Sequence, residues 1–130
     1  WDPEVSGKLS DAPDYPHRAR KAVREMHRQV GDLQMDAGGI AEKGLLVRHL
    51  VMPGGLAGTE GVLHFIAEEI SRSTYVNIMS QYHPCGEAVG SSLIGRTITS
   101  REFEDALRAA EREGLTRLDE RHKHWLTFEL

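Results

Sequence analysis

Cysteine is almost missing from this 130-residue sequence, in which Cys85 is the only one. A single cysteine excludes a disulfide bond within the chain. Disulfides persist in oxidising compartments and are rare in the cytosol, so this usage favours a cytoplasmic location. It also leaves one thiolate at most for metal or redox chemistry.

Two further absences concern charge and hydrophobic runs. Lysine and arginine number 16 against 20 aspartate and glutamate residues, for a net charge of −4. Without a basic excess, the chain is not expected to bind nucleic acid. No apolar run approaches the roughly 18 residues of a membrane-spanning helix, so no membrane partner is expected. The remaining composition, 39% hydrophobic and 28% charged, is typical of one globular domain.

Hydrophobic residues recur at helical spacing in three stretches, which predict helices. The first stretch begins at Pro16 and should bury a stripe that includes Met26. The last is marked most clearly, because Thr99 and Glu102 form a capping box and Gly114 suits a helix end. Residues 1–15, rich in proline and short polar residues, are predicted as loop, and residues 36–39 (Asp-Ala-Gly-Gly) as a turn. The predicted helices are residues 16–30, 59–70 and 99–113, and His122 and His124 beyond them are expected to be solvated.

Two stretches are typical of buried strands. Residues 45–52 are apolar apart from Arg48 and His49, and residues 74–79 form a second run, with a possible short strand near Leu118. Helices and strands therefore alternate, which indicates an α/β fold with parallel strands. Two or three strands cannot close a barrel, and exposed sheet edges favour pairing with another chain, including self-association.

Arg48 interrupts an apolar strand, and its orientation can be predicted. Side chains alternate along a strand, so Arg48 shares one face with Leu50 and Met52. An unpaired guanidinium under apolar helices would be costly, which places this face away from the helices, together with Asn77 and His83. A structural ion pair is the alternative explanation of the arginine. Leu45, Val47, His49 and Val51 should face the helices instead.

Ligands of α/β proteins gather at the carboxyl ends of strands, and two such ends occur here. Residues 52–59 form a glycine-rich passage that opens a helix, which suits close backbone approach and an anion, or is an ordinary turn. No Gly-Lys-Ser/Thr follows, so the passage is not a phosphate-binding P-loop. After the second strand, Asn77, Gln81 and His83 share one parity. The spacing of the histidines and Cys85 does not support a zinc site.

Residues 44–60, with the sequence GLLVRHLVMPGGLAGTE, resemble the fifth strand and loop of a radical S-adenosylmethionine family. That family consists of relatives of pyruvate formate-lyase activating enzyme. Residues 25–32, 65–71 and 75–85 match it in the same order, and with residues 1–4 the resemblance covers roughly residues 1–115. It implies that residues 1–130 are the C-terminal portion of a partial (β/α)6 TIM-like barrel, whose N-terminal portion is absent from this chain.

The resemblance also implies cofactors and partners. Family members hold a 4Fe-4S cluster on a CxxxCxxC motif near the first strand and reductively cleave S-adenosylmethionine. This chain lacks the motif, so neither cofactor is expected to bind it stably, and the chain alone should be inactive. The implied partners are the missing N-terminal half of the barrel and a glycyl-radical protein substrate.

By resemblance and parity, the chain contributes to the S-adenosylmethionine cradle and supplies no catalytic or metal-binding residue. Two other functions remain open on the residues alone. One is a small α/β module that binds an anionic ligand with the Gly54–Thr59 loop, and the other is an interaction piece that pairs its sheet edges with another chain. The expected cofactor-binding residues are Arg48, Leu50, Met52, Pro53, Gly54, Asn77 and His83.

Overall fold

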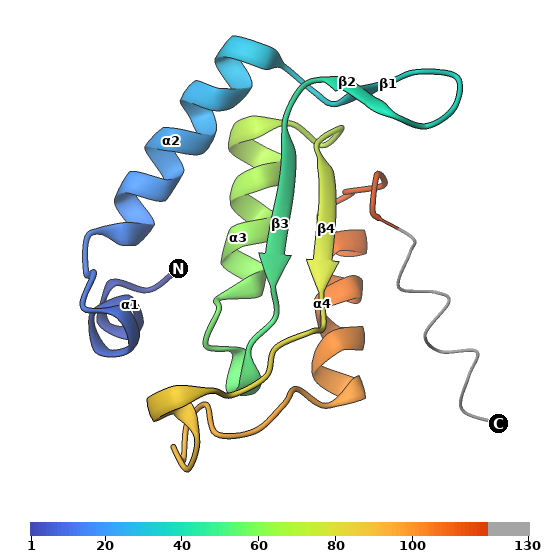
Figure 1. The fold of residues 1–130 in the computed structure, drawn as a ribbon. Helices are drawn as coiled ribbons and strands as arrows, with labels where there is room; N and C mark the ends of the chain where they lie inside the picture. Colours follow the sequence, from blue (N-terminus) through green and yellow to red (C-terminus); the bar gives the residue numbers. More distant parts are fainter. Residues whose placement is uncertain (120–130) are drawn as a thin grey trace, which may run out of the picture.

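The computed structural model describes residues 1–119, and its centre is a pair of parallel strands (Figure 1). Strand β3 (Leu46–Leu50) pairs with β4 (Tyr75–Met79) in parallel, with Arg48 opposite Asn77. The predicted α/β class and parallel pairing are confirmed. His122 and His124 lie outside the described residues.

Two helical segments cover one face of this pair. Helix α3 (Thr59–Phe65) continues into a π-helical turn, η2 (Ile66–Ile70), and α4 (Ser100–Arg112) lies beside it behind the strands (Figure 1). Their apolar stripes meet the inner side chains of the strands, and burying such surface drives the packing. The largest fully buried core side chains are Leu63, Ile66, Leu115 and Val76.

Helix α2 (Tyr15–Val30) has the predicted bounds, but it is less buried than its pattern indicates. It packs against η2 at the side of the sheet, and Arg24 reaches Glu69 there. Met26, expected in the buried stripe, is 52% exposed. That expectation was wrong because the contacts of α2 with the described chain cover only part of its apolar stripe.

The prediction of loop for residues 1–15 is wrong as well, because α1 (Pro3–Ser10) forms there. Asp2 caps this helix by accepting the N–H of Glu4 at 2.7 Å, and Pro3 occupies the first turn, where no N–H is needed. The helix ends at Asp11, whose backbone is left-handed (φ 50°). These local caps outweigh the helix-breaking tendency of Gly7 in the interior.

A small antiparallel hairpin precedes β3. Strands β1 (Gln34–Met35) and β2 (Ala41–Lys43) flank the turn that was expected at residues 36–39. The Asp36 carboxylate holds this turn by accepting the N–H groups of Gly38 and Ile40, each at 2.8 Å. The turn is confirmed, whereas the two short strands beside it were not predicted.

The strand expected near Leu118 exists as a single parallel bridge to Val76. The Val76 N–H donates to the Arg117 carbonyl at 3.0 Å, and the Asp119 N–H donates to the Val76 carbonyl at 3.0 Å. Part of the outer edge of β4 is therefore paired. The strands of residues 1–119 form two separate two-stranded sheets, neither of them closed, and membership of the β3–β4 pair in a TIM-like barrel stays a prediction.

Candidate functional site

The two faces of β3 differ as the alternation predicts. His49 (8% exposed) and Val51 (3%) point toward the helices, whereas Arg48 is exposed on the uncovered face. Asn77, its register partner on β4, is half-buried on the same face. The predicted orientation of the strand is confirmed, and Arg48 has solvent rather than apolar helices around its charge.

His49 is a buried polar group close to the carboxyl end of the sheet. Its Nε2 lies 2.9 Å from Oγ1 of Thr59, the first residue of α3. Burial of the imidazole lowers the pKa of His49 to about 4. The imidazole is therefore neutral near neutral pH, and it ties β3 to the start of α3.

A cavity of about 520 Å³ opens at this carboxyl end, beside the loop that joins β3 to α3. Its size falls within the range of about 300–1,000 Å³ that is common for small-molecule sites. The lining combines the end of β3, the glycine loop, the start of α3 and the first turns of α4. The residues are Val51, Met52, Gly54, Gly55, Gly58, Thr59, Glu60, Gly61, Glu102, Asp105 and Ala106.

The glycine loop, residues 52–59 between β3 and α3, depends on glycine at three positions. It opens with a short 3-10 turn, η1 (Pro53–Gly55), in which Gly54 and Gly55 have φ values of 65° and 69°. At Gly58 (φ 64°), an added Cβ would lie 2.6 Å from Cβ of Trp1, so a side chain there would clash as well as strain the backbone. These positions allow the backbone to bend tightly around the cavity.

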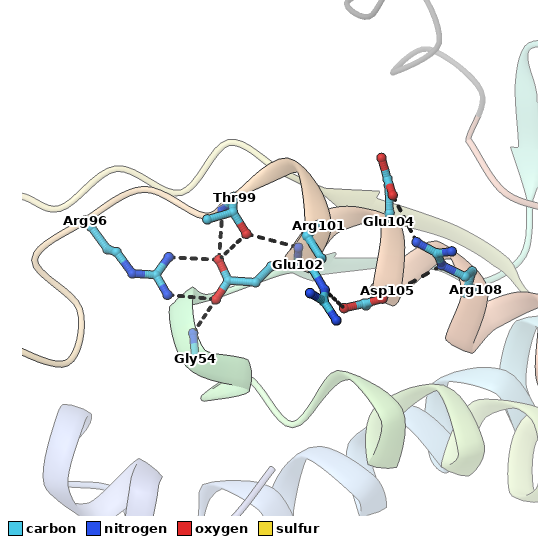
Figure 2. Close-up of polar contacts among 8 residues, drawn as sticks. All are labelled: Gly54, Arg96, Thr99, Arg101, Glu102, Glu104, Asp105 and Arg108. Carbon is cyan, nitrogen blue, oxygen red and sulfur yellow. Dashed lines mark hydrogen bonds and ion pairs between the residues drawn. The ribbon is translucent and has the colours of Figure 1, made fainter.

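Glu102 of α4 links this loop to the helix cap (Figure 2). One of its oxygens accepts the Gly54 N–H at 2.7 Å and Nη2 of Arg96 at 2.8 Å. The other accepts Nη1 of Arg96 at 2.8 Å, the Thr99 N–H at 2.8 Å and the Thr99 hydroxyl at 3.0 Å. Arg96 first, and then the backbone donors of Thr99 and Gly54, hold the pKa of Glu102 well below its usual range. The predicted capping box is confirmed and extends to a second element.

The charge of the cavity is negative. Glu60, Glu102 and Asp105 line it, and its lining contains no lysine or arginine among the described residues. Glu60 pairs with Arg112 at 2.8 Å on the surface, whereas the closest arginine nitrogens lie 3.8 and 3.9 Å from Asp105. The Gly54 N–H, a donor that an anion would need, is already used by Glu102. The site therefore suits a cationic or hydroxyl-rich ligand better than an anion.

The structure divides the predicted cofactor-binding residues between two places. Met52 and Gly54 line the cavity, and Pro53 is buried beneath the loop. Arg48, Leu50 and Asn77 share the uncovered face of the sheet, and His83 is exposed in the segment after β4, outside the cavity lining.

Sequence reasoning missed the three cavity carboxylates. Glu102 did carry a signal, since it was recognised as part of the capping box, but that pattern was interpreted only as a helix start. Glu60 and Asp105 carry no signal that separates them from the other charged residues on the surfaces of α3 and α4.

A second polar cluster lies at the amino end of the sheet. Asp32 accepts the Ser71 hydroxyl at 2.9 Å, and its other oxygen lies 3.0 Å from Nε2 of His27. The carboxylate stands between the other two side chains, so the His27 imidazole does not contact the serine hydroxyl as the general base of a Ser–His–Asp triad would. The cluster joins α2 to the turn between η2 and β4 and is structural.

Neither metal ligands nor a membrane helix can be identified in residues 1–119. The structure places no group of three or more His, Cys, Asp or Glu side chains there that could hold a metal ion. Cys85 is exposed. No helix in the described part of the chain is long and apolar enough to cross a membrane.

Comparison with known proteins gives one relative. A protein of Methanocaldococcus jannaschii, described as uncharacterised, is 38% identical over 77 residues. The match covers 58% of this chain and 22% of that protein, so the chain corresponds to less than a quarter of its relative's length. No family model matches the chain, and no solved structure matches it. By sequence, the chain is similar to one part of this archaeal protein.

Proposed function

We propose that this chain is the C-terminal part of a radical S-adenosylmethionine enzyme related to pyruvate formate-lyase activating enzyme. In this proposal, the carboxyl end of β3 forms part of the cradle that binds S-adenosylmethionine. The observation that carries it is the acidic cavity beside the β3–α3 loop. The parallel β3–α3–β4–α4 order, in which each strand is followed by a helix, supports it, because TIM-like barrels bind ligands at this end of their strands.

The chemistry of the lining suits this cofactor. S-adenosylmethionine carries a positive sulfonium and an ammonium group, together with ribose hydroxyls. Exposed carboxylates such as Glu60 and Asp105 would attract the cations and accept hydrogen bonds from the hydroxyls. Val51, Met52 and Ala106 offer apolar surface for the adenine ring. The described residues thus fit binding and orientation of the cofactor.

The described residues do not fit a 4Fe-4S cluster. Such clusters take about three or four cysteine thiolates, and the chain has one cysteine. The proposal therefore places the cluster in the N-terminal half of the barrel, which would pack against this chain. A cytoplasmic location and a glycyl-radical protein as substrate belong to the same proposal and rest on the sequence resemblance.

The cavity counts against the alternative of an anion-binding module. An anion in the Gly54–Thr59 loop would face the carboxylates of Glu60 and Asp105, and it would compete with Glu102 for the Gly54 N–H. The negative charges of the anion and of these carboxylates would repel each other, so a phosphate or sulfate should bind weakly in this loop.

The proposal is tested on the protein encoded by the whole reading frame that contains these residues. We expect a CxxxCxxC motif roughly one hundred residues before Trp1, as cluster ligation in this family requires. After anaerobic reconstitution with iron and sulfide, the protein should bind S-adenosylmethionine in calorimetry and consume it under reducing conditions. A reading frame that begins directly before Trp1 and has no such motif, or binding of inorganic phosphate without binding of S-adenosylmethionine, would contradict the proposal.

A further inference from the structure

We propose that Glu102 is a positioning residue for the cavity, which sets the conformation of the Gly54–Gly55 turn without contacting the ligand itself. The identity of the ligand rests on the function proposed above, whereas the control of the turn by Glu102 does not. The link joins α4 to the β3–α3 loop across 48 residues of sequence.

The Glu102 carboxylate has no capacity left for a ligand. Each carboxylate oxygen offers about two lone-pair sites. Oε1 already accepts Gly54 N–H and Arg96 Nη2, and Oε2 accepts three donors from Arg96 and Thr99. A ligand could reach Glu102 only by displacing one of these groups. Its effect on binding must therefore pass through the residues that it holds.

The conformation of the Gly54–Gly55 turn requires a restraint from outside the turn. Gly54 and Gly55 both have positive φ values, and glycine visits negative φ as readily, so local preference does not select this conformation. Inside the turn, the bond from the Leu56 N–H to the Pro53 carbonyl is long, at 3.4 Å. The Gly54 N–H instead donates to Glu102 at 2.7 Å, in the range of charge-assisted hydrogen bonds. The tertiary contact is thus the stronger restraint on the first half of the loop.

Arg96 completes the arrangement by neutralising Glu102 with two bonds, each of 2.8 Å (Figure 2). Among the three cavity carboxylates, this one is held most closely by its own arginine. The nearest arginine nitrogens lie 3.8 Å and 3.9 Å from Asp105, so less of its negative charge is compensated and it can attract a ligand cation more strongly. Glu102 therefore holds the loop that lines the cavity, and Asp105 supplies negative charge for the ligand.

The decisive variant is Glu102→Gln. Glutamine keeps the size of the side chain but has only one acceptor oxygen. Its NH2 group is a donor, so it cannot accept the hydrogen bonds from Thr99 or Arg96 that the second carboxylate oxygen accepts. The Pro53–Gly54 dipeptide occurs once in this chain, so isotope labelling of proline carbonyls and glycine nitrogens selects the Gly54 amide in NMR spectra. Loss of the signal in Gly54→Ala assigns it. In Glu102→Gln, the Gly54 amide proton should move upfield and exchange faster with solvent.

Two controls separate positioning from helix stability. Thr99→Val removes the capping hydroxyl, including its bond to Oε2 of Glu102, and weakens α4, but it keeps the negative charge of Glu102 and the bond from Gly54 to Oε1. Glu104→Gln makes the same change two residues further on, at a side chain that pairs with Arg108. Both should leave the Gly54 resonance in place. An unchanged resonance in Glu102→Gln, or an equal shift in Thr99→Val, would overturn the proposal.

The ligand is tested separately, by titrating the reconstituted full-length protein with S-adenosylmethionine. Loss of one charge-assisted hydrogen bond should weaken binding roughly tenfold in Glu102→Gln and leave it unchanged in Glu104→Gln. If the wild-type protein does not bind while the Gly54 resonance still depends on Glu102, the proposed function is wrong and the positioning role stands. Undiminished affinity in a variant whose Gly54 resonance has moved would overturn the role of Glu102 in binding.

Discussion

The two faces of the β3–β4 pair differ in burial, because helices cover one face and leave the other exposed. On the covered face, Val76 and Ile78 are 0% and 2% exposed beneath α3 and α4 (Figure 1). On the other face, Leu46 is 38% exposed and Arg48 stands beside Asn77 with no described helix over them. Burial of apolar side chains, and with it stability, is concentrated on one face, whereas the other face and the carboxyl edge of the strands stay accessible to a ligand.

The largest expected effect comes from a leucine-to-alanine change made once in the core that covers one face of the strands, at Leu63 of α3, and once on the uncovered face, at Leu46 of β3. Leu63→Ala should lower the free energy of unfolding by about 2–5 kcal/mol, because Leu63 is fully buried and the change leaves a cavity. Leu46→Ala on the uncovered face should cost less than about 1 kcal/mol. Urea denaturation measures both. Equal losses would show that another part of the protein covers the open face, and would break the contrast.

Acid should weaken the covered face through His49. Its pKa is lowered to about 4 from 6.5, so as the pH falls between these values the unfolded state binds the proton first. Stability is then fully present above pH 6.5, falls toward pH 4 and loses up to about 3 kcal/mol. Urea midpoints across this range should show the slope in the wild type and in the exposed control His17→Gln. His49→Gln should lose it, and a slope that persists in that variant would exclude His49 as its source.

The smallest expected effect concerns binding of S-adenosylmethionine at the uncovered face. In the protein encoded by the whole reading frame, the proposed function predicts that Arg48→Ala weakens S-adenosylmethionine binding about tenfold, equivalent to about 1.4 kcal/mol, and leaves the urea midpoint unchanged. Arg72→Ala is the matched control, since Arg72 precedes β4 at the amino end of the sheet and pairs with Glu68. Unchanged affinity in Arg48→Ala would remove the uncovered face from the proposed site and leave only the cavity.

The sequence predicted the framework of the fold better than its site. Strand alternation around Arg48 and the Thr99–Glu102 capping box were both found, because each depends on residues a few positions apart. Within the loop expected over residues 1–15, Pro3–Ser10 form a helix, because the cap at Asp2 stabilises it more than Gly7 destabilises it. The stripe through Met26 was overestimated, because periodicity shows which face is apolar but not whether a partner covers it.

The local sequence was enough to predict the parallel α/β order, the two sides of β3 and the glycines that bend the loop after it. These follow from side-chain alternation, local capping and the conformational freedom of glycine. The acidic lining of the cavity and the bond between Glu102 and Gly54, by contrast, arise from tertiary packing. Those features join residues some fifty positions apart, and nothing in the local sequence of either partner indicates that packing of α4 against the loop will bring them together.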